Sequence, residues 1–277
     1  MNTTTNRAYF MTGCASGIGR HVADLLLARG ERVYATDVNV DAMTEYALKT
    51  GWPKERVRMD KLDVRNVEAW DEVFGRAVEQ FGKIDVCMNI AGIMLSGYCH
   101  EQPAKEIDLQ IDINLKGVIW GTQTAARHMI QNKSGHIINI ASMAGIASIP
   151  GLSVYTATKH GVRGFSLAAS YDLKGYGIAV TAVCPDAIDT PLLEQSSKTE
   201  AGAMVFSGSR LLTLEEIGDL IVNRVLVNRP IEVAVPFSRA VLSKVANLFP
   251  ALGGTVLPAL TKKGRTHQGE HASKISG

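Results

Sequence analysis

The stretch Thr12–Gly19, with the sequence TGCASGIG, decides the fold of this chain. It follows a short apolar run, Ala8–Met11, and precedes an amphipathic segment that closes at Gly30. This order predicts a buried strand, a glycine loop and a helix. Glycines let the backbone approach a pyrophosphate closely, and the free amides at a helix N-terminus favour its negative charge. The stretch therefore predicts a turn that binds phosphate groups.

Strands and helices continue to alternate along the chain. The further predicted strands are Arg32–Asp37, Val57–Leu62, Ile84–Asn89, His136–Ile140, Ala179–Cys184 and Ile231–Val235. The predicted helices include Val67–Phe81, Ile107–Ile130, a helix that carries Tyr155 and runs to Lys174, and Leu214–Leu226. Such alternation implies right-handed βαβ units around a parallel sheet. Asn114 is a poor interior helix residue, so we expect it to mark a local kink or to hold a water.

An acidic residue closes the second predicted strand. Asp37 lies eighteen residues beyond Gly19, close to where a carboxylate binds the 2′-hydroxyl of an adenosine ribose. A carboxylate at this place accepts hydrogen bonds from hydroxyls and repels a 2′-phosphate. Val38 follows, so no adjacent arginine would welcome that phosphate. The pattern favours NAD over NADP; the alternative is that Asp37 only caps a helix or a turn.

Tyr155 and Lys159 are four residues apart, which places their side chains on one face of a helix. A fixed ammonium beside a phenol stabilises the phenolate, so we expect the pKa of Tyr155 to lie below its usual value of about 10. Such a tyrosine can exchange a proton with an alcohol or a carbonyl. Ser142, thirteen residues upstream, follows a predicted strand that could bring its hydroxyl to the tyrosine. By itself the pair also fits two ordinary helix residues.

The composition excludes several classes of protein. The 277 residues, 46% hydrophobic and 20% charged, fit one sizeable soluble domain. A net charge of +2 and no basic cluster with interleaved aromatics argue against nucleic-acid binding. Four scattered cysteines without a CxxC pair indicate reduced thiols and a cytoplasmic location, and the seven histidines form no metal motif. The polar start, Met1–Arg7, does not read as a signal peptide.

Two segments near the end of the chain carry no strand pattern. Residues 192–211, within a substrate loop of about 190–213, are rich in Ser, Gly and Ala and predict a mobile lid over a site, or else a passive surface loop. Ala240–Leu260 is apolar but broken by prolines and glycines, so it should not span a membrane, although peripheral membrane contact stays open. The polar tail, Thr261–Gly277, predicts disorder.

Together these motifs resemble the short-chain dehydrogenase/reductase family in its short single-domain form. The resemblance covers about residues 8–235 and rests on Thr12-Gly13-x-x-x-Gly17-x-Gly19, Asp37, Asp63, Asn89-Ile90-Ala91-Gly92, Asn114, Ser142, Tyr155-x-x-x-Lys159 and Pro185-x-x-Ile188-x-Thr190. It implies an α/β fold with a Rossmann-like, doubly wound parallel sheet and a nicotinamide cofactor across the strand C-termini. We expect one catalytic domain over residues 1–239, followed by an apolar segment and polar tail over 240–277.

The resemblance also assigns roles to residues. It implies that Tyr155 is the acid/base, that Lys159 binds the nicotinamide ribose, that Ser142 orients the substrate oxygen and that Asn114 holds a water in a proton relay. The cofactor-binding residues that it predicts are Gly13, Ser16, Gly17, Ile18, Gly19, Asp37, Asp63, Val64, Asn89, Ala91, Gly92, Tyr155, Lys159, Pro185, Ile188 and Thr190. The predicted substrate-binding residues are Met94, Ser142, Met143, Ile149, Tyr155, Asp186, Leu193 and Phe206.

The chain departs from the family pattern at two positions. Ile90 stands where a second asparagine is usual, and we expect little effect. Asp186 stands where glycine usually follows Pro185. Its carboxylate either faces the nicotinamide end of the cleft, where it would favour the positively charged oxidised ring, or turns away and caps the next turn together with Asp189.

We therefore expect an NAD-dependent oxidoreductase that interconverts a secondary alcohol and a ketone. Most of the predicted substrate-binding residues are apolar, which suggests a bulky apolar substrate such as a steroid, terpenoid or lipid alcohol. The alternative is a non-catalytic NAD-binding regulatory protein, which loss of Ser142, Tyr155 or Lys159 would have favoured; all three are present. We expect no metal, no nucleic-acid partner, and a homodimer or homotetramer, the common assemblies of the family.

Overall fold

The computed structural model describes residues 6–275, apart from the side chains of residues 195, 197, 250, 252–254, 256, 274 and 275. The predictions for the two ends of the chain, that residues 1–7 are no signal peptide and that the tail to residue 277 is disordered, fall partly outside the described residues.

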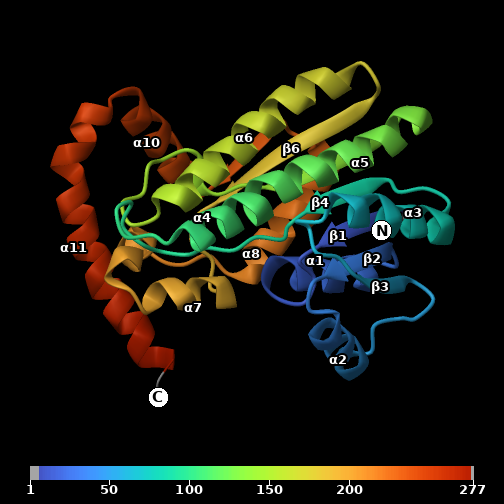
Figure 1. Ribbon diagram of the computed structural model, residues 1–277, viewed down its shortest axis with the longest axis horizontal. Helices are drawn as coiled ribbons and strands as arrows, with labels where there is room; N and C mark the ends of the chain where they lie inside the picture. The colour runs from blue at the N-terminus through green and yellow to red at the C-terminus, as the bar shows by residue number, and fades with distance from the viewer. Residues whose placement is uncertain (1–5, 276–277) are drawn as a thin grey trace.

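A seven-stranded parallel sheet forms the centre of the molecule, in the order β3-β2-β1-β4-β5-β6-β7 (Figure 1). The strands are β1 (Ala8–Thr12), β2 (Arg32–Asp37), β3 (Val57–Lys61), β4 (Val86–Asn89), β5 (Gly135–Ile140), β6 (Ile178–Pro185) and β7 (Glu232–Val235). The chain adds strands in one direction from β1 to β3 and in the other from β4 to β7. This reversal makes the fold doubly wound, as predicted, and it opens a crevice at the C-terminal ends of β1 and β4.

Helices cover both faces of the sheet (Figure 1). One core lies between the sheet and α1, α2 and α8, and a second lies between the sheet and α3, α5 and α6. The helices and helical turns are α1 (Gly17–Ala28), α2 (Val40–Thr50), α3 (Val67–Phe81), α4 (Ala104–Ile111), η1 (Asp112–Lys116), α5 (Gly117–Asn132), η2 (Met143–Gly145), α6 (Ser153–Lys174), α7 (Pro191–Ser197), η3 (Glu200–Ser207), α8 (Leu214–Asp219), η4 (Leu220–Val225), α9 (Leu226–Asn228), α10 (Phe237–Leu248) and α11 (Pro250–Ile275).

The long helix predicted over Ile107–Ile130 is interrupted where Asn114 sits. The segment η1 is a π-helical turn between α4 and α5. The Asn114 amide Nδ2 donates to the Ile93 carbonyl at 2.8 Å, and its Oδ1 accepts from the Ile93 amide, also at 2.8 Å. A π-helical turn thus replaces the regular α-helix around Asn114, and the Asn114 side chain joins η1 to the loop that follows β4.

The prediction of a disordered tail is wrong over the described residues. The tail predicted to be disordered from Thr261 belongs to α11, and the boundary drawn at residue 240 falls inside α10. The substrate loop, expected to be irregular, consists largely of α7 and η3. The polar composition of the tail suggested disorder, but His267 and Gln268 of α11 form hydrogen bonds with the backbone of the substrate loop. No helix among the described residues is long and apolar enough to cross a bilayer.

A buried histidine should make folding stability depend on acidity. His136 on β5 is 1% exposed, and its Nε2 lies 2.9 Å from the Thr181 hydroxyl. Burial lowers the pKa of His136 from 6.5 to about 3. The unfolded chain therefore takes up this proton at higher pH than the folded chain, and the stability present above about pH 6.5 is lost as the pH falls toward 3.

We expect the free energy of unfolding to fall by about 1.4 kcal/mol per pH unit across that window from this proton alone. Urea titrations between about pH 7 and pH 4 should show a weaker pH dependence for His136→Gln than for the wild type. His100→Gln is the control because His100 is exposed. Parallel profiles for the wild type and His136→Gln would contradict the assignment.

Candidate active site

One cleft of about 440 Å³ runs along the C-terminal edge of the sheet. Its walls come from the glycine loop after β1, the ends of β2 and β3, the loop after β4, the segment after β5, the start of α6 and the loop after β6. Of the residues predicted from sequence, it brings together Gly13, Ser16, Gly17, Ile18, Gly19, Asp37, Asp63, Val64, Ala91, Gly92, Met94, Ser142, Met143, Ile149, Tyr155, Lys159, Pro185, Asp186, Ile188, Thr190 and Leu193. The two ends of the cleft have different chemistry.

The glycine loop at one end has the backbone geometry of a phosphate cradle. Gly13 and Gly17 have φ of +74° and +52°, a left-handed conformation that favours glycine. A Cβ on Gly19 would lie 2.1 Å from the Gly13 carbonyl oxygen. The first turn of α1 follows at once, and the Ser16 side chain at its start makes no capping bond there. A loop without side chains at its glycines, followed directly by a helix N-terminus, fits the pyrophosphate of a dinucleotide.

Asp37 borders the same end of the cleft. Its Oδ2 accepts from the Ala15 amide and its Oδ1 from the Asn39 amide, each at 2.9 Å. These bonds fix the carboxylate between the glycine loop and the start of α2, so Asp37 both lines the cleft and stabilises a turn. Nearby, Asp63 forms hydrogen bonds with the Arg65 guanidinium, which lower the pKa of its carboxyl.

Ser142, Tyr155 and Lys159 meet at the other end. Ser142 follows β5 and begins η2, while Tyr155 and Lys159 lie one turn apart on α6. The Lys159 Nζ donates to the Ile140 carbonyl at 2.8 Å and lies 5.7 Å from the centre of the Tyr155 ring. Tyr155 is 7% exposed and Lys159 is 4% exposed. The structure therefore brings Ser142, Tyr155 and Lys159 together, and it shields the tyrosine and the lysine almost completely from water.

The expectation that the pKa of Tyr155 lies below its usual value is wrong for the protein alone. Burial raises the pKa of Tyr155 to about 12, and a hydrogen bond with Ser142 opposes the rise only in part. Burial also lowers the pKa of Lys159 to about 8, because an ammonium is costly in the same dry place. A site shielded from water disfavours both the phenolate of Tyr155 and the ammonium of Lys159. The nearby lysine does not reverse the effect of burial on the pKa of the tyrosine.

Three predicted residues do not line the cleft. The Asn89 side chain points into the core and donates to Asn139 Oδ1 at 2.8 Å. Asn114 lies just behind the cleft wall, since a Cβ on Gly92 would meet its Oδ1 at 3.2 Å. Phe206 packs beneath α11, with its ring 5.4 Å from that of His271. We find Asn89 and Asn114 holding backbone and core together behind the site.

Arg239 lines the cleft and was not predicted. It comes from α10, and its Nε lies 2.9 Å from Asp186 Oδ2 in an ion pair that is mostly buried. Burial raises the pKa of Asp186, and the guanidinium opposes that rise. Neither role that we expected for Asp186 included an ion pair with Arg239. The positive charge of the guanidinium largely compensates the negative charge of the carboxylate. No sequence signal connects Arg239 with Asp186, because only the path of the C-terminal extension, which consists of α10 and α11, brings them together.

The fold and these groups define a nucleotide-dependent oxidoreductase, and comparison with known proteins names the family. The sequence pattern described as short chain dehydrogenase matches residues 7–201. The chain therefore belongs to the short-chain dehydrogenase/reductase family, and its members act as oxidoreductases on alcohols and ketones.

Individual relatives agree with this assignment. The chain is 36% identical over 197 residues to 2-(R)-hydroxypropyl-CoM dehydrogenase of Xanthobacter autotrophicus, covering 68% of this chain and 77% of that protein. Levodione reductase is similar in structure, with a TM-score of 0.76 and 29% identity, covering 86% of this chain and 98% of the other. A family member from Burkholderia phymatum, solved with NAD, has a TM-score of 0.81 and 22% identity over 89% and 95% of the two chains, and shows the shared fold.

Proposed function

We propose that the protein is an NAD-dependent secondary-alcohol dehydrogenase or ketone reductase. The observation that carries the proposal is the placement of Ser142, Tyr155 and Lys159 in the same cleft as the glycine loop. Relatives named as a dehydrogenase and a reductase support the same reaction class. They give no support to the alternative, a non-catalytic regulator.

In the proposed reaction the chain supplies positioning and a proton. The glycine loop and the first turn of α1 would hold the pyrophosphate, while Asp37 would bind the adenosine ribose and Lys159 the nicotinamide ribose. The bound nicotinamide would supply hydride transfer to or from the carbon that bears the oxygen. Ser142 would orient the substrate oxygen, and Tyr155 would give a proton to the ketone oxygen or take it from the alcohol. The positive charge of the oxidised ring would favour the phenolate and so counteract the effect of burial on Tyr155.

We infer a preference for NAD from Asp37 and expect it to be measurable. The ratio of catalytic efficiencies with NAD and NADP should favour NAD because the carboxylate repels a 2′-phosphate. Asp37→Ala should shrink the ratio, and Asp37→Ala with Val38→Arg should reverse it. Asp41→Ala, in the first turn of α2, is the control for a lost carboxylate nearby. Equal efficiencies with both cofactors in the wild type would contradict the inference.

We infer an apolar substrate from the residues around the tyrosine. Tyr155 belongs to a cluster of buried apolar side chains that also contains Met94, Leu152 and Leu193, with Ile149 packed against it. A cluster of this kind favours a bulky apolar alcohol or ketone, such as a steroid, terpenoid or lipid alcohol. A screen of secondary alcohols with NAD, followed by the absorbance of the reduced nicotinamide, tests this. Higher catalytic efficiency with short polar alcohols than with bulky apolar ones would contradict it.

We also propose that the protein works as a homodimer or homotetramer in the cytoplasm. The cysteines, which are free in the structure, support an intracellular location. The expected interface pairs the helix that carries Tyr155 and the segment that carries Asn114 with those of a second copy. Light scattering that gives the mass of a monomer at micromolar concentration would contradict the proposed assembly.

A further inference from the structure

The substrate loop has two faces, and only one of them belongs to the cleft. Met204 and Val205 of η3 line the cleft, as does Leu193 of α7. Two other residues of η3 contact α11. Phe206, which also belongs to the apolar cluster around Tyr155, packs against His271, and the Ala203 backbone touches α11 at Gly264. Figure 1 shows α11 running along this outer side, next to α7. The wall of the pocket is therefore a thin layer between the cleft and α11.

Hydrogen bonds from α11 hold this layer by its backbone. The Gln268 amide Nε2 donates to the Ser196 carbonyl at 2.9 Å and to the Thr199 carbonyl at 2.8 Å. A single side chain thus joins the end of α7 to the start of η3. The His267 Nδ1 lies 3.1 Å from the Phe206 carbonyl at the far end of η3. Backbone carbonyls that a flexible loop would offer to water have a fixed partner here.

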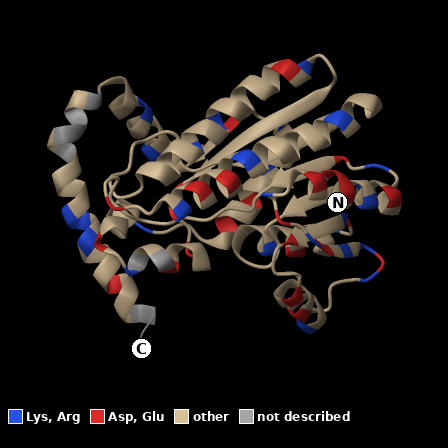
Figure 2. Cartoon of the chain, in the orientation of Figure 1, with Lys and Arg blue, Asp and Glu red and all other residues tan. Residues whose placement is uncertain are grey.

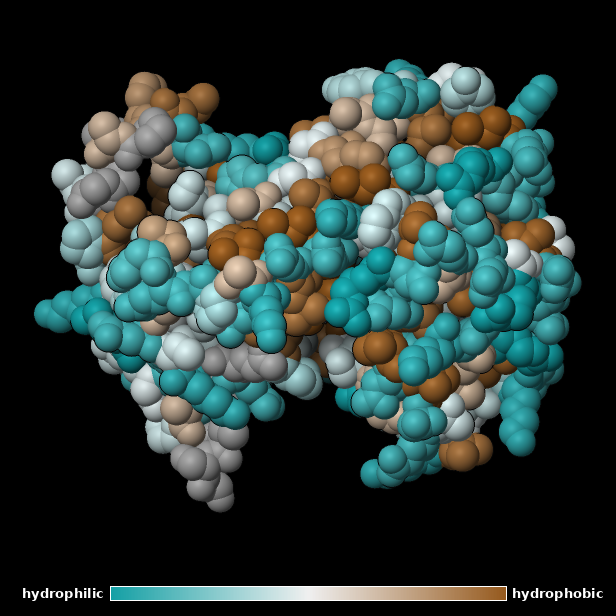
Figure 3. Space-filling model, viewed as in Figure 1, coloured by the Kyte–Doolittle hydropathy of each residue, from teal (hydrophilic) through white to brown (hydrophobic). Residues whose placement is uncertain are grey.

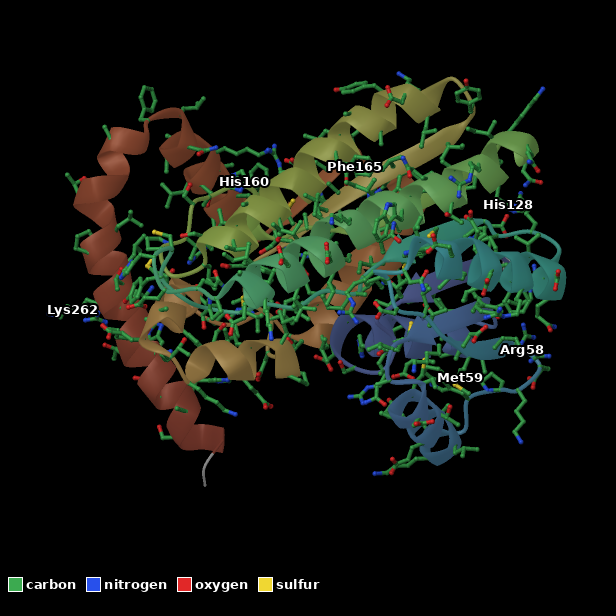
Figure 4. The ribbon with its side chains drawn as sticks, in the orientation of Figure 1. Arg58, Met59, His128, His160, Phe165 and Lys262 are labelled. Atoms are coloured by element: carbon green, nitrogen blue, oxygen red, sulfur yellow. The ribbon has the colours of Figure 1, made fainter. Side chains whose placement is uncertain are left out.

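The contact residues occupy one face of α11. Gly264, His267, Gln268 and His271 follow helical spacing. At Gly264 the two backbones meet, because a Cβ there would lie 2.2 Å from the Ala203 carbonyl oxygen. Lys262 points outward in Figure 4, and Figure 2 shows Lys and Arg residues along the middle of α11. The helix is thus shaped for contact with the loop on one face and for solvent on the other.

The same C-terminal extension also holds the end of the loop from inside the cleft. The Arg239 Nη2 donates to the Ser207 hydroxyl at 2.9 Å, while its Nε pairs with Asp186 at 2.9 Å. Ser207 is the last residue of η3, and Asp186 directly follows Pro185 at the end of β6. The extension therefore contacts the loop at its middle, on its outer face and at its end.

We propose that the C-terminal extension is a functional part of the substrate site, in which α11 positions the substrate loop as a fixed wall and so determines which substrates fit. This rests on the proposed function for the identity of the site. Gln268 and Gly264 are positioning residues: they touch neither the cleft nor the cofactor residues, and act through Leu193, Met204 and Val205. The competing view is a loop that opens freely as a lid while α11 only adds to overall stability.

Two glycines of α11 give a matched test. Gly264→Ala places a methyl group against the Ala203 backbone, whereas Gly269→Ala points into open space, with nothing within 4 Å. Both substitutions favour the helix equally. We expect backbone amides of residues 192–207 to exchange with solvent deuterium about 10-fold faster or more in Gly264→Ala than in the wild type. Exchange in β5 and β6, and in every segment of Gly269→Ala, should stay at the wild-type rate.

Gln268→Ala provides a second variant, with Lys262→Ala as its control, should Gly264→Ala not fold. It removes two backbone bonds without adding volume, so the same segment should exchange faster. Loop amides that exchange in Gln268→Ala at the wild-type rate, or that are already unprotected in the wild type, would overturn the proposal. Because exchange is measured on the free protein, this outcome does not depend on the proposed oxidoreductase function.

Substrate discrimination tests the functional half of the proposal. With NAD and two probe alcohols, propan-2-ol and octan-2-ol, a loosened wall should raise KM for octan-2-ol several-fold with a smaller change in kcat. The dissociation constant of NADH should stay within twofold of the wild type. Faster loop exchange without any change in the ratio of kcat/KM for the two alcohols would show that the wall does not select substrates. Failure of the wild type to oxidise any secondary alcohol would count against the proposed function and leave the exchange result standing.

Discussion

Tyr155→Phe is expected to lower turnover by about 100- to 10,000-fold, because it removes the group proposed to exchange a proton with the substrate oxygen. The phenyl ring keeps the packing of Tyr155 against its apolar neighbours, so the fold and the glycine loop should be undisturbed. NADH affinity, measured by fluorescence, should therefore stay close to that of the wild type. The loss should appear in kcat with little change in cofactor binding.

Tyr171→Phe is the matched control. Tyr171 lies on the same helix, α6, but its side chain is 70% exposed and does not line the cleft. It should leave both turnover and thermal stability unchanged. Near wild-type turnover in Tyr155→Phe would remove the basis of the proposed mechanism, whereas a loss of NADH binding together with turnover would point to a damaged site.

The same pair of proteins tests the protonation state of the tyrosine. In the protein alone, the pKa of about 12 keeps Tyr155 protonated at neutral pH. The difference in phenolate absorbance between the wild type and Tyr155→Phe should then appear only at strongly alkaline pH. It should move to lower pH when NAD⁺ is added, because a nearby positive charge favours the phenolate.

Local patterns in the sequence were sufficient to predict the sheet and most of the residues that meet in the cleft. The glycine loop, the end of β2 and the pair on α6 are each read from residues close together in the chain, and the sheet topology brings their C-terminal ends to one edge. Helix α3 was predicted at its observed bounds because its apolar stripe is regular. Helix α2 was missed, although Asn39 caps its start and Gly51 its end, because it buries only Met43 and Ala47.

What the sequence did not predict depends on contacts between distant segments. The pairing of Asp186 with Arg239 and the packing of α11 on η3 bring together residues from separate parts of the chain. Polar groups make many of the contacts between α11 and the substrate loop. The sequence of α11 therefore lacks the apolar periodicity that would have predicted a helix. Apolar side chains are exposed on α10, among them Leu242 and Leu248, and at Phe249 directly after it, and brown surface marks this end of the molecule in Figure 3. Burial of Tyr155 likewise cannot be read from spacing, and it reversed the expected direction of its pKa shift.

The second large effect is expected at the opposite end of the cleft, from Gly19→Ala. The added Cβ would lie 2.1 Å from the Gly13 carbonyl oxygen and 2.7 Å from its carbonyl carbon, distances that force the loop or the first turn of α1 to move. The strand and the helix are fixed by the core packed around Met11, Val22 and Leu26, so the strain should fall on the loop between them. A displaced loop no longer presents its amides to the pyrophosphate.

We expect Gly19→Ala to weaken NADH binding by about 100-fold or more, which corresponds to about 2.7 kcal/mol or more. Gly75→Ala is the matched control, because Gly75 lies inside α3 with nothing within 4 Å of an added Cβ. Fluorescence titration with NADH and thermal unfolding should be measured on both variants. If Gly19→Ala binds NADH as tightly as the control, the dinucleotide cannot lie against this loop, and the positions inferred for Asp37 and Tyr155 along the same cofactor would be wrong as well. If Gly19→Ala unfolds at a much lower temperature, the glycine serves the packing of α1 on the sheet, and Asp37→Ala becomes the sharper probe of the cofactor site.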